Sequence, residues 1–139
     1  LMFVDSSAFM AILLDEPDAT DLLVRLQENR RKPITSPVVR YEVVVSLARS
    51  RAEGRPITQE DLDLATERFD GLLQLLGCTE IMVTTKIGRL AAETAAIYGK
   101  VAGHPAKLNM GDCLSYAAAK SNNMPLLYKG NDFAETDLA

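Results

Sequence analysis

Short apolar runs along the chain alternate with longer segments in which apolar positions recur every three or four residues. The short runs predict buried β-strands over residues 2–4, 33–35, 81–84 and 125–128. The longer segments predict α-helices over residues 8–14, 17–31, 38–53, 58–76, 86–101 and 111–121. Alternation of short apolar strands with helices is typical of a parallel sheet covered on both faces. The pattern therefore predicts an α/β fold, a three-layer α/β/α sandwich with a short central parallel sheet.

Residues that start and stop helices support several of these boundaries. Ser36 and Pro37 suit the N-cap and the first turn of the helix over residues 38–53. Thr58 and Asp61 have the spacing of a capping box at the start of the next helix, and Gly77 is placed to end it.

The length and composition of the chain limit the classes of protein to consider. Its 139 residues suit a single domain over residues 1–139 with one hydrophobic core. No apolar run approaches the roughly 20 residues of a membrane span, and no signal-peptide pattern is visible, so we expect a cytoplasmic protein with no membrane association. Cys78 and Cys113 are far apart and form no CxxC pair, which favours buried thiols over a zinc site.

Charge is unevenly distributed along the chain. The net charge is −4, which argues weakly against a protein that coats nucleic acid. Residues 25–56, however, contain eight basic and three acidic side chains. This stretch is either a basic strip that faces a phosphate backbone or the solvated face of a helix, and the sequence does not decide between the two.

Four acidic residues stand at positions where strands end or helices begin. Asp5 directly follows the first strand, and it also suits the N-cap of the following helix. Glu42 lies one turn into an apolar helix, where it either faces a cavity that holds a cation or pairs on the surface with Arg40 or Arg49. Asp112 heads an alanine-rich helix, where it can also simply favour the helix dipole. Asp132 follows the last strand and can alternatively be a turn residue.

These four carboxylates are expected to converge. Ligands of parallel α/β sheets bind beyond the carboxyl ends of the strands. Asp5 and Asp132 follow strands that can both be central, and Glu42 and Asp112 lie in early turns of helices that begin at the same edge. Converging carboxylates repel one another unless a hard divalent cation neutralises them, and oxygen ligands suit Mg²⁺ or Mn²⁺. The pattern predicts metal-assisted hydrolysis of a phosphodiester without a Ser, Cys or His nucleophile.

Several basic residues flank the acids in the sequence. Arg40, Lys107 and Lys129 can contact substrate phosphate, although surface charge is an alternative for each of them. His104 is the only histidine, and it lies in the loop before Asp112, where it either contacts the substrate or caps the loop.

Four segments resemble, in order, the motifs of VapC-type toxins of the PIN-domain ribonuclease family. The segments are Val4-Asp5-Ser6-Ser7-Ala8, Tyr41-Glu42, Leu108-Asn109-Met110-Gly111-Asp112-Cys113 and Leu126-Leu127-Tyr128-Lys129-Gly130-Asn131-Asp132-Phe133. The resemblance covers nearly the whole chain. It implies the toxin of a type II toxin–antitoxin system, an endoribonuclease that cuts RNA with Mg²⁺ or Mn²⁺. It also implies a VapB-like antitoxin that covers the site, usually a homodimer, and a toxin–antitoxin hetero-oligomer.

The resemblance also implies roles for individual residues. The metal ligands of the family correspond to Asp5 and Asp112, and its remaining acids correspond to Glu42 and Asp132. Many PIN domains carry the fourth acid slightly earlier, where this chain has Asn131. Ser7 matches the small hydroxyl residue beside the first acid, where it can bind a phosphate or water.

Three other readings compete with this one. A receiver domain normally needs an acidic pair near its first strand, but Asp5 has no acidic neighbour until Asp15. A dehalogenase-like phosphatase needs a second Asp two residues after the first, and that position is Ser7. The third alternative is a catalytically silent PIN domain that acts as an RNA- or protein-binding module.

Overall fold

Four short parallel strands form the centre of the molecule. The computed structural model describes residues 1–28 and 30–139. The strands are β1 (Met2–Val4), β2 (Pro33–Thr35), β3 (Thr79–Glu80) and β4 (Leu126–Leu127), and they lie side by side in the order β3-β2-β1-β4. In the register of the sheet, Phe3 of β1 is aligned with Ile34 on one side and with Leu126 on the other. The expected position of Asp5 after a central strand is therefore confirmed, whereas the strand before Asp132 lies at an edge.

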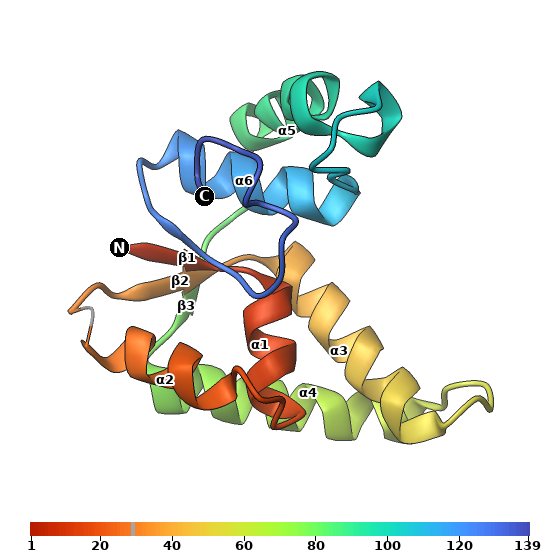
Figure 1. Cartoon of the computed structure of the whole chain (residues 1–139). Helices are drawn as coiled ribbons and strands as arrows, with labels where there is room; N and C mark the ends of the chain where they lie inside the picture. Colours follow the sequence, from red (N-terminus) through yellow and green to blue (C-terminus); the bar gives the residue numbers. More distant parts are fainter. Residues whose placement is uncertain (29) are drawn as a thin grey trace.

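Six helices within the described residues surround this sheet (Figure 1). They are α1 (Ser6–Leu13), α2 (Ala19–Glu28), α3 (Pro37–Ala52), α4 (Gln59–Leu76), α5 (Thr85–Tyr98) and α6 (Met110–Ser121). Helices α5 and α6 cover one face, and α1, α2 and α4 lie on the other, while α3 leads away from the sheet beside α4. The three-layer α/β/α fold is thus confirmed. No helix of the described segments is both long and apolar enough to cross a membrane.

Several expected boundaries were wrong. The third strand is Thr79–Glu80 rather than residues 81–84. The Ile81 amide still donates a hydrogen bond to the carbonyl of Thr35 (2.8 Å), and the chain leaves the sheet after this contact. Met82 is 81% exposed, so this apolar run faces solvent. The helix expected over 86–101 ends at Tyr98, where Gly99 adopts an extended backbone, and a short 3₁₀ turn (Lys100–Ala102) follows. The helix expected over 17–31 is observed as Ala19–Glu28, and residue 29 lies outside the described residues.

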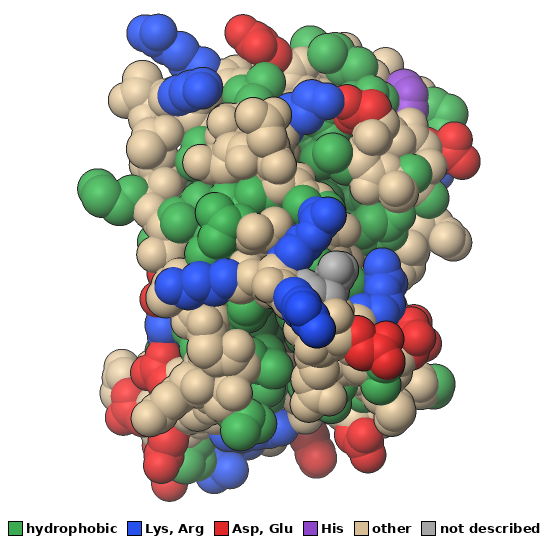
Figure 2. Space-filling model, turned by 90° about the vertical axis from the view of Figure 1, so that its left-hand side faces the viewer, with side chains coloured by type: hydrophobic (Ala, Val, Ile, Leu, Met, Phe, Trp, Pro, Cys, Tyr) green, Lys and Arg blue, Asp and Glu red, His purple; other side chains and the backbone are tan. Residues whose placement is uncertain are grey.

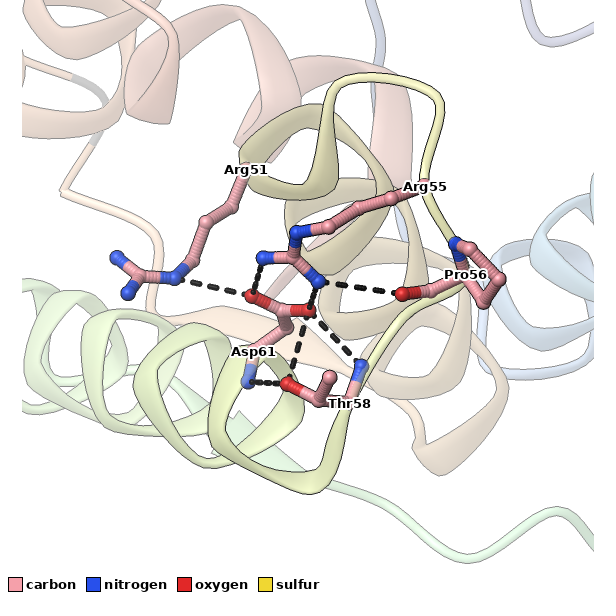
Figure 3. Close-up of polar contacts among 5 residues, drawn as sticks. All are labelled: Arg51, Arg55, Pro56, Thr58 and Asp61. Atoms are coloured by element: carbon pink, nitrogen blue, oxygen red, sulfur yellow. Dashed lines mark hydrogen bonds and ion pairs between the residues drawn. The ribbon is translucent and has the colours of Figure 1, made fainter.

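The expected helix caps explain how α3 and α4 are joined. The Ser36 side chain accepts a hydrogen bond from the Val39 amide, and Thr58 and Asp61 form the capping box of α4. The Asp61 carboxylate is 1% exposed and also accepts hydrogen bonds from Arg51 and Arg55 (Figure 3). The hydrogen bond from the Arg55 guanidinium, and to a smaller extent the one from the Thr58 amide, holds the pKa of Asp61 well below its usual range. These contacts tie the end of α3 to the start of α4.

The basic stretch over residues 25–56 does not form one continuous strip. Arg51 and Arg55 bind Asp61, and Arg40 binds Asp70 and Glu80. The exposed residues 30–32 precede β2, so they lie at the edge where the strands begin. Figure 2 shows the molecule from this side, with Lys and Arg side chains gathered across the middle of the face. Because Asp5 follows the carboxyl end of β1, this basic face is at the opposite edge from the carboxylates.

Candidate carboxylate site

Asp5 is fixed between the end of β1 and the start of α1. It is 2% exposed, and its extended backbone makes it the N-cap of α1. Its Oδ2 accepts hydrogen bonds from the Ser7 amide (3.1 Å) and the Ser7 hydroxyl (2.8 Å). Its other oxygen, Oδ1, is buried and has no hydrogen-bond partner in the described part of the chain. A buried carboxylate oxygen without a partner is costly, which suits a group that binds a cation.

Ser7 connects Asp5 to the segment that follows β4. Its hydroxyl accepts a hydrogen bond from the Lys129 amide (3.0 Å) while it donates to Asp5. The side chain therefore fixes the orientation of the carboxylate and the position of the chain after β4. This arrangement places Ser7 beside the acids, as expected, with its proton already used to orient Asp5.

Glu42 reaches the same region from the second turn of α3, and Gly111 makes room for it. A Cβ atom at position 111 would lie 2.1 Å from Oε2 of Glu42, which is too close for any side chain. Oε1 of Glu42 is buried and lacks a hydrogen-bond partner among the described residues. Neither Arg40 nor Arg49 forms an ion pair with it in this part of the chain, so the surface pair considered from the sequence is not formed. Sequence reasoning missed Gly111, although a glycine inside the first turn of a helix is a recognisable signal.

Asp112 is held at the start of α6 by a reciprocal cap. Its amide donates to Oδ1 of Asn109 (2.9 Å), and its own Oδ2 accepts from the Asn109 amide (3.1 Å). Asp132 is exposed, and it lines a cavity together with Asp112. Asp132 is also close enough to raise the pKa of Asp112 by electrostatic repulsion. The four expected acids therefore face one region from β1, α3, α6 and the segment after β4.

Burial and mutual repulsion raise the pKa of two of these acids. Burial, followed by the charges of Asp5 and Asp112, raises the pKa of Glu42 to about 7, although a hydrogen bond from Ser6 opposes the rise. Burial also raises the pKa of Asp112 to about 6, with repulsion from Asp5 and Asp132, against the stabilising hydrogen bond from the Asn109 amide. Carboxylates that repel one another in this way are a common sign of a functional site.

Two of the three basic residues expected to contact substrate phosphate, Arg40 and Lys129, are engaged elsewhere. Arg40 binds Glu80 through two hydrogen bonds (2.8 and 3.0 Å) and also pairs with Asp70. The Lys129 ammonium forms an ion pair with Glu16. Arg40 precedes Glu42 and Lys129 precedes Asp132 by only a few residues, but their ion pairs are with other acids.

The donors of this site fit a hard divalent cation. Within residues 1–28 and 30–139, no three acidic, histidine or cysteine side chains are already gathered into a coordination shell. The unpartnered oxygens of Asp5 and Glu42 and the raised pKa values of Glu42 and Asp112 nevertheless mark the acids as under-compensated. All donors are carboxylate oxygens, which are the ligands that Mg²⁺ and Mn²⁺ prefer.

The raised pKa values predict that the metal-free protein is more stable at pH 5 than at pH 8. A folded-state pKa above the unfolded value contributes stability that is complete below about pH 4 and is lost as the pH rises through about 6 to 7. Discounted for partial exposure, the change is roughly 1–3 kcal/mol, or about 5 °C in Tm. Thermal unfolding in EDTA between pH 5 and 8 measures it.

Two substitutions locate the source of this pH dependence. Glu42→Gln should remove most of the slope of Tm against pH. His104→Gln, which changes the only histidine of the chain and leaves the four acids in place, should retain it. A wild-type Tm that rises from pH 5 to pH 8 would contradict the prediction.

Comparison with known proteins identifies the family of this chain. A family model described as the PIN domain matches residues 2–138. The chain is 43% identical to a VapC ribonuclease of Rhizobium meliloti (strain 1021), and the match covers 99% of both chains. It is 37% identical to ribonuclease VapC28 of Mycobacterium tuberculosis, covering 97% of this chain and 93% of the relative.

Two solved structures share the fold at 16% sequence identity. One is a toxin–antitoxin complex from Klebsiella pneumoniae, with a TM-score of 0.68 over 99% of this chain and 94% of that chain. The other is VapC20 of Mycobacterium tuberculosis, described as a toxin that cleaves the sarcin–ricin loop, with a TM-score of 0.69 over 96% of this chain and 93% of that chain. On the full-length match to the family and to its relatives, this chain belongs to the PIN-domain family and, within it, to the VapC ribonucleases.

Proposed function

We propose that this protein is the toxin of a type II toxin–antitoxin system and that it hydrolyses RNA phosphodiester bonds with Mg²⁺ or Mn²⁺. The observation that carries the proposal is the convergence of Asp5, Glu42 and Asp112, with two buried carboxylate oxygens that lack partners. The names of its relatives, which are VapC ribonucleases over the whole chain, support the reaction class.

The residues of the site have separate roles in this proposal. Asp5 and Asp112 are the proposed metal ligands, and Ser7 and Asn109 hold them in place. A divalent cation bound there would hold the scissile phosphate, lower the pKa of the attacking water and stabilise the leaving oxygen. Glu42, whose pKa is raised to about 7, is suited to accept a proton from that water at Oε1. Asp132 adds negative charge at the open side of the site.

Two kinds of protein partner belong to the same proposal. The first is a VapB-like antitoxin that inhibits the enzyme by placing a basic side chain against the four carboxylates, whose charge is otherwise under-compensated. The second is another copy of this chain. Tyr41 (69% exposed), Met82 (81%) and Met110 (79%) line one apolar hollow on the surface. Contact with a second copy would remove these side chains from water, so the hollow suits a homodimer interface. A sedimentation measurement that finds only monomers at high micromolar concentration would exclude the dimer.

Cleavage of structured RNA tests the proposed activity. The purified protein is incubated with labelled transfer RNA and with a sarcin–ricin loop fragment, the target named for the VapC20 relative. Mg²⁺ or Mn²⁺ should support discrete cuts that EDTA abolishes. Binding of RNA or of an antitoxin without any cleavage, in either metal, would instead favour the silent binding module.

A further inference from the structure

A polar cavity lies beside Asp112 and Asp132 on the side of α5 and α6, and the proposed function gives no role to the basic residues that line it. Its volume is about 440 Å³, within the range of small-ligand sites. The cavity extends from the 3₁₀ turn after α5 to the first turn of α6. The polar residues that line it are Lys100, His104, Lys107, Asn109, Asp112 and Asp132.

The two lysines of this cavity differ from the other basic residues near the acids. Arg40 and Lys129 are engaged by Glu80, Asp70 and Glu16. In the described part of the chain, neither Lys100 nor Lys107 forms an ion pair. Their charge is therefore available to an anion that lies beside Asp112 and Asp132.

A tight turn presents Lys107 and His104 together. Lys107 has a φ of +52°, a left-handed conformation that a lysine rarely adopts, and its amide donates to the carbonyl of His104 (3.0 Å). The chain then returns to the protein core, where Leu108 forms a bridge with Gly99. Lys107 also lines the cavity, and strained backbone conformations are found most often at functional sites.

The protonation of His104 follows from its own hydrogen bond. Nδ1 accepts from the Ala106 amide (3.0 Å), and a backbone amide can only donate, so the proton of the neutral ring is on Nε2. The ring also packs at right angles on Tyr98, with centroids 5.1 Å apart. A fixed N–H donor and two free ammonium groups thus line the same cavity.

We propose that this cavity binds the phosphate of a nucleotide adjacent to the scissile bond in single-stranded RNA. The inference rests on the proposed function and adds to it a phosphate subsite on the α5–α6 side of the carboxylates. Lys100 and Lys107 attract the RNA backbone, which four carboxylates would otherwise repel, and His104 donates to a phosphate oxygen. A phosphate held in this subsite would set the direction in which the RNA strand runs across the four carboxylates.

Salt-dependent binding of RNA tests the subsite. Binding of a fluorescent single-stranded RNA is measured by anisotropy from 50 to 200 mM KCl, in an Asp5→Asn parent that prevents turnover. Lys107→Met should weaken binding about 3- to 10-fold and reduce the slope of log K against log [salt] by about 0.7, the value for one lost phosphate contact. The double variant with Lys100→Met should lose about twice that slope. Lys86→Met, on an exposed lysine of α5 outside the cavity, should change neither.

A histidine variant and two controls separate the possible outcomes. His104→Phe keeps a ring against Tyr98 but removes the donor, so binding should weaken while the slope is unchanged. Lys107→Met made in the wild-type background should retain the Tm and the Mn²⁺ affinity of the wild type, which shows that the fold and the acids are intact. A slope for Lys107→Met equal to that of its parent overturns the subsite, even if the wild type cleaves RNA. Failure of the wild type to cleave any RNA, with the slope reduced as expected, would instead overturn the nuclease proposal and leave the subsite standing.

Discussion

Replacing Asp112 by Asn is expected to reduce RNA cleavage by about 1000-fold and, at the same time, to stabilise the metal-free protein. Activity falls because an amide oxygen carries no charge to hold a divalent cation. Stability rises because the substitution removes a carboxylate whose pKa is raised by burial and by repulsion from Asp5 and Asp132. The Asn side chain can still accept from the Asn109 amide, so the cap of α6 is retained. Single-turnover cleavage and Tm in EDTA, both at pH 8, measure the two effects.

A matched control distinguishes this result from a general effect of charge. Asp63 lies on the exposed side of α4, where it accepts a hydrogen bond from Gln59. Asp63→Asn makes the same change in net charge and should leave both cleavage and Tm nearly unaltered. A variant at position 112 that loses stability as well as activity would show that the carboxylate is a structural cap and that its repulsion with the other acids is unimportant.

The positions of Asp5 and Asp112 could be predicted from the sequence because each one is tied to the end of a strand or the start of a helix. Asp5 follows an apolar strand, and Asp112 begins a helix, so the backbone alone brings them to one edge of the sheet. Glu42 was harder to place, since its helix has apolar residues all around and does not define a single buried face. The position of the Glu42 carboxyl depends on Gly111, because the missing side chain of this glycine leaves a space that the carboxyl fills.

Contacts of the long cationic side chains could not be predicted in the same way. Arg40 is two residues from Glu42, but successive residues of a helix point in different directions, and Arg40 reaches Glu80 of β3 instead. Lys129 follows β4 near the acids, yet its ammonium pairs with Glu16 after α1. The run over residues 81–84 has the composition of a buried strand, but β2 offers it only one further backbone contact, at Ile81. In each case the outcome depends on a partner far away in the sequence.

Replacing Gly111 by Ala is expected to reduce cleavage by about 100-fold and to cost roughly 1–3 kcal/mol of stability. The new methyl group would lie 2.1 Å from Oε2 and 2.6 Å from Cδ of Glu42, so the carboxyl must leave its position. Gly71 provides a matched control, because it also lies within a helix and an added Cβ would meet nothing within 4 Å. Gly71→Ala should stabilise the protein by up to about 1 kcal/mol and leave cleavage unchanged.

A double-mutant cycle shows whether Glu42 is the cause. When Glu42→Ala removes the obstructing carboxyl, adding Gly111→Ala should no longer destabilise the protein and should instead give the usual gain of a helical alanine, about 0.5–1 kcal/mol. Urea unfolding of the four proteins in EDTA gives the coupling energy directly. If the glycine substitution costs the same with and without Glu42, the close approach of α3 and α6 at this point is a matter of backbone packing. If the cost disappears, Gly111 serves to admit the third carboxylate to the site, and its small size is as much a requirement of the proposed chemistry as the acids themselves.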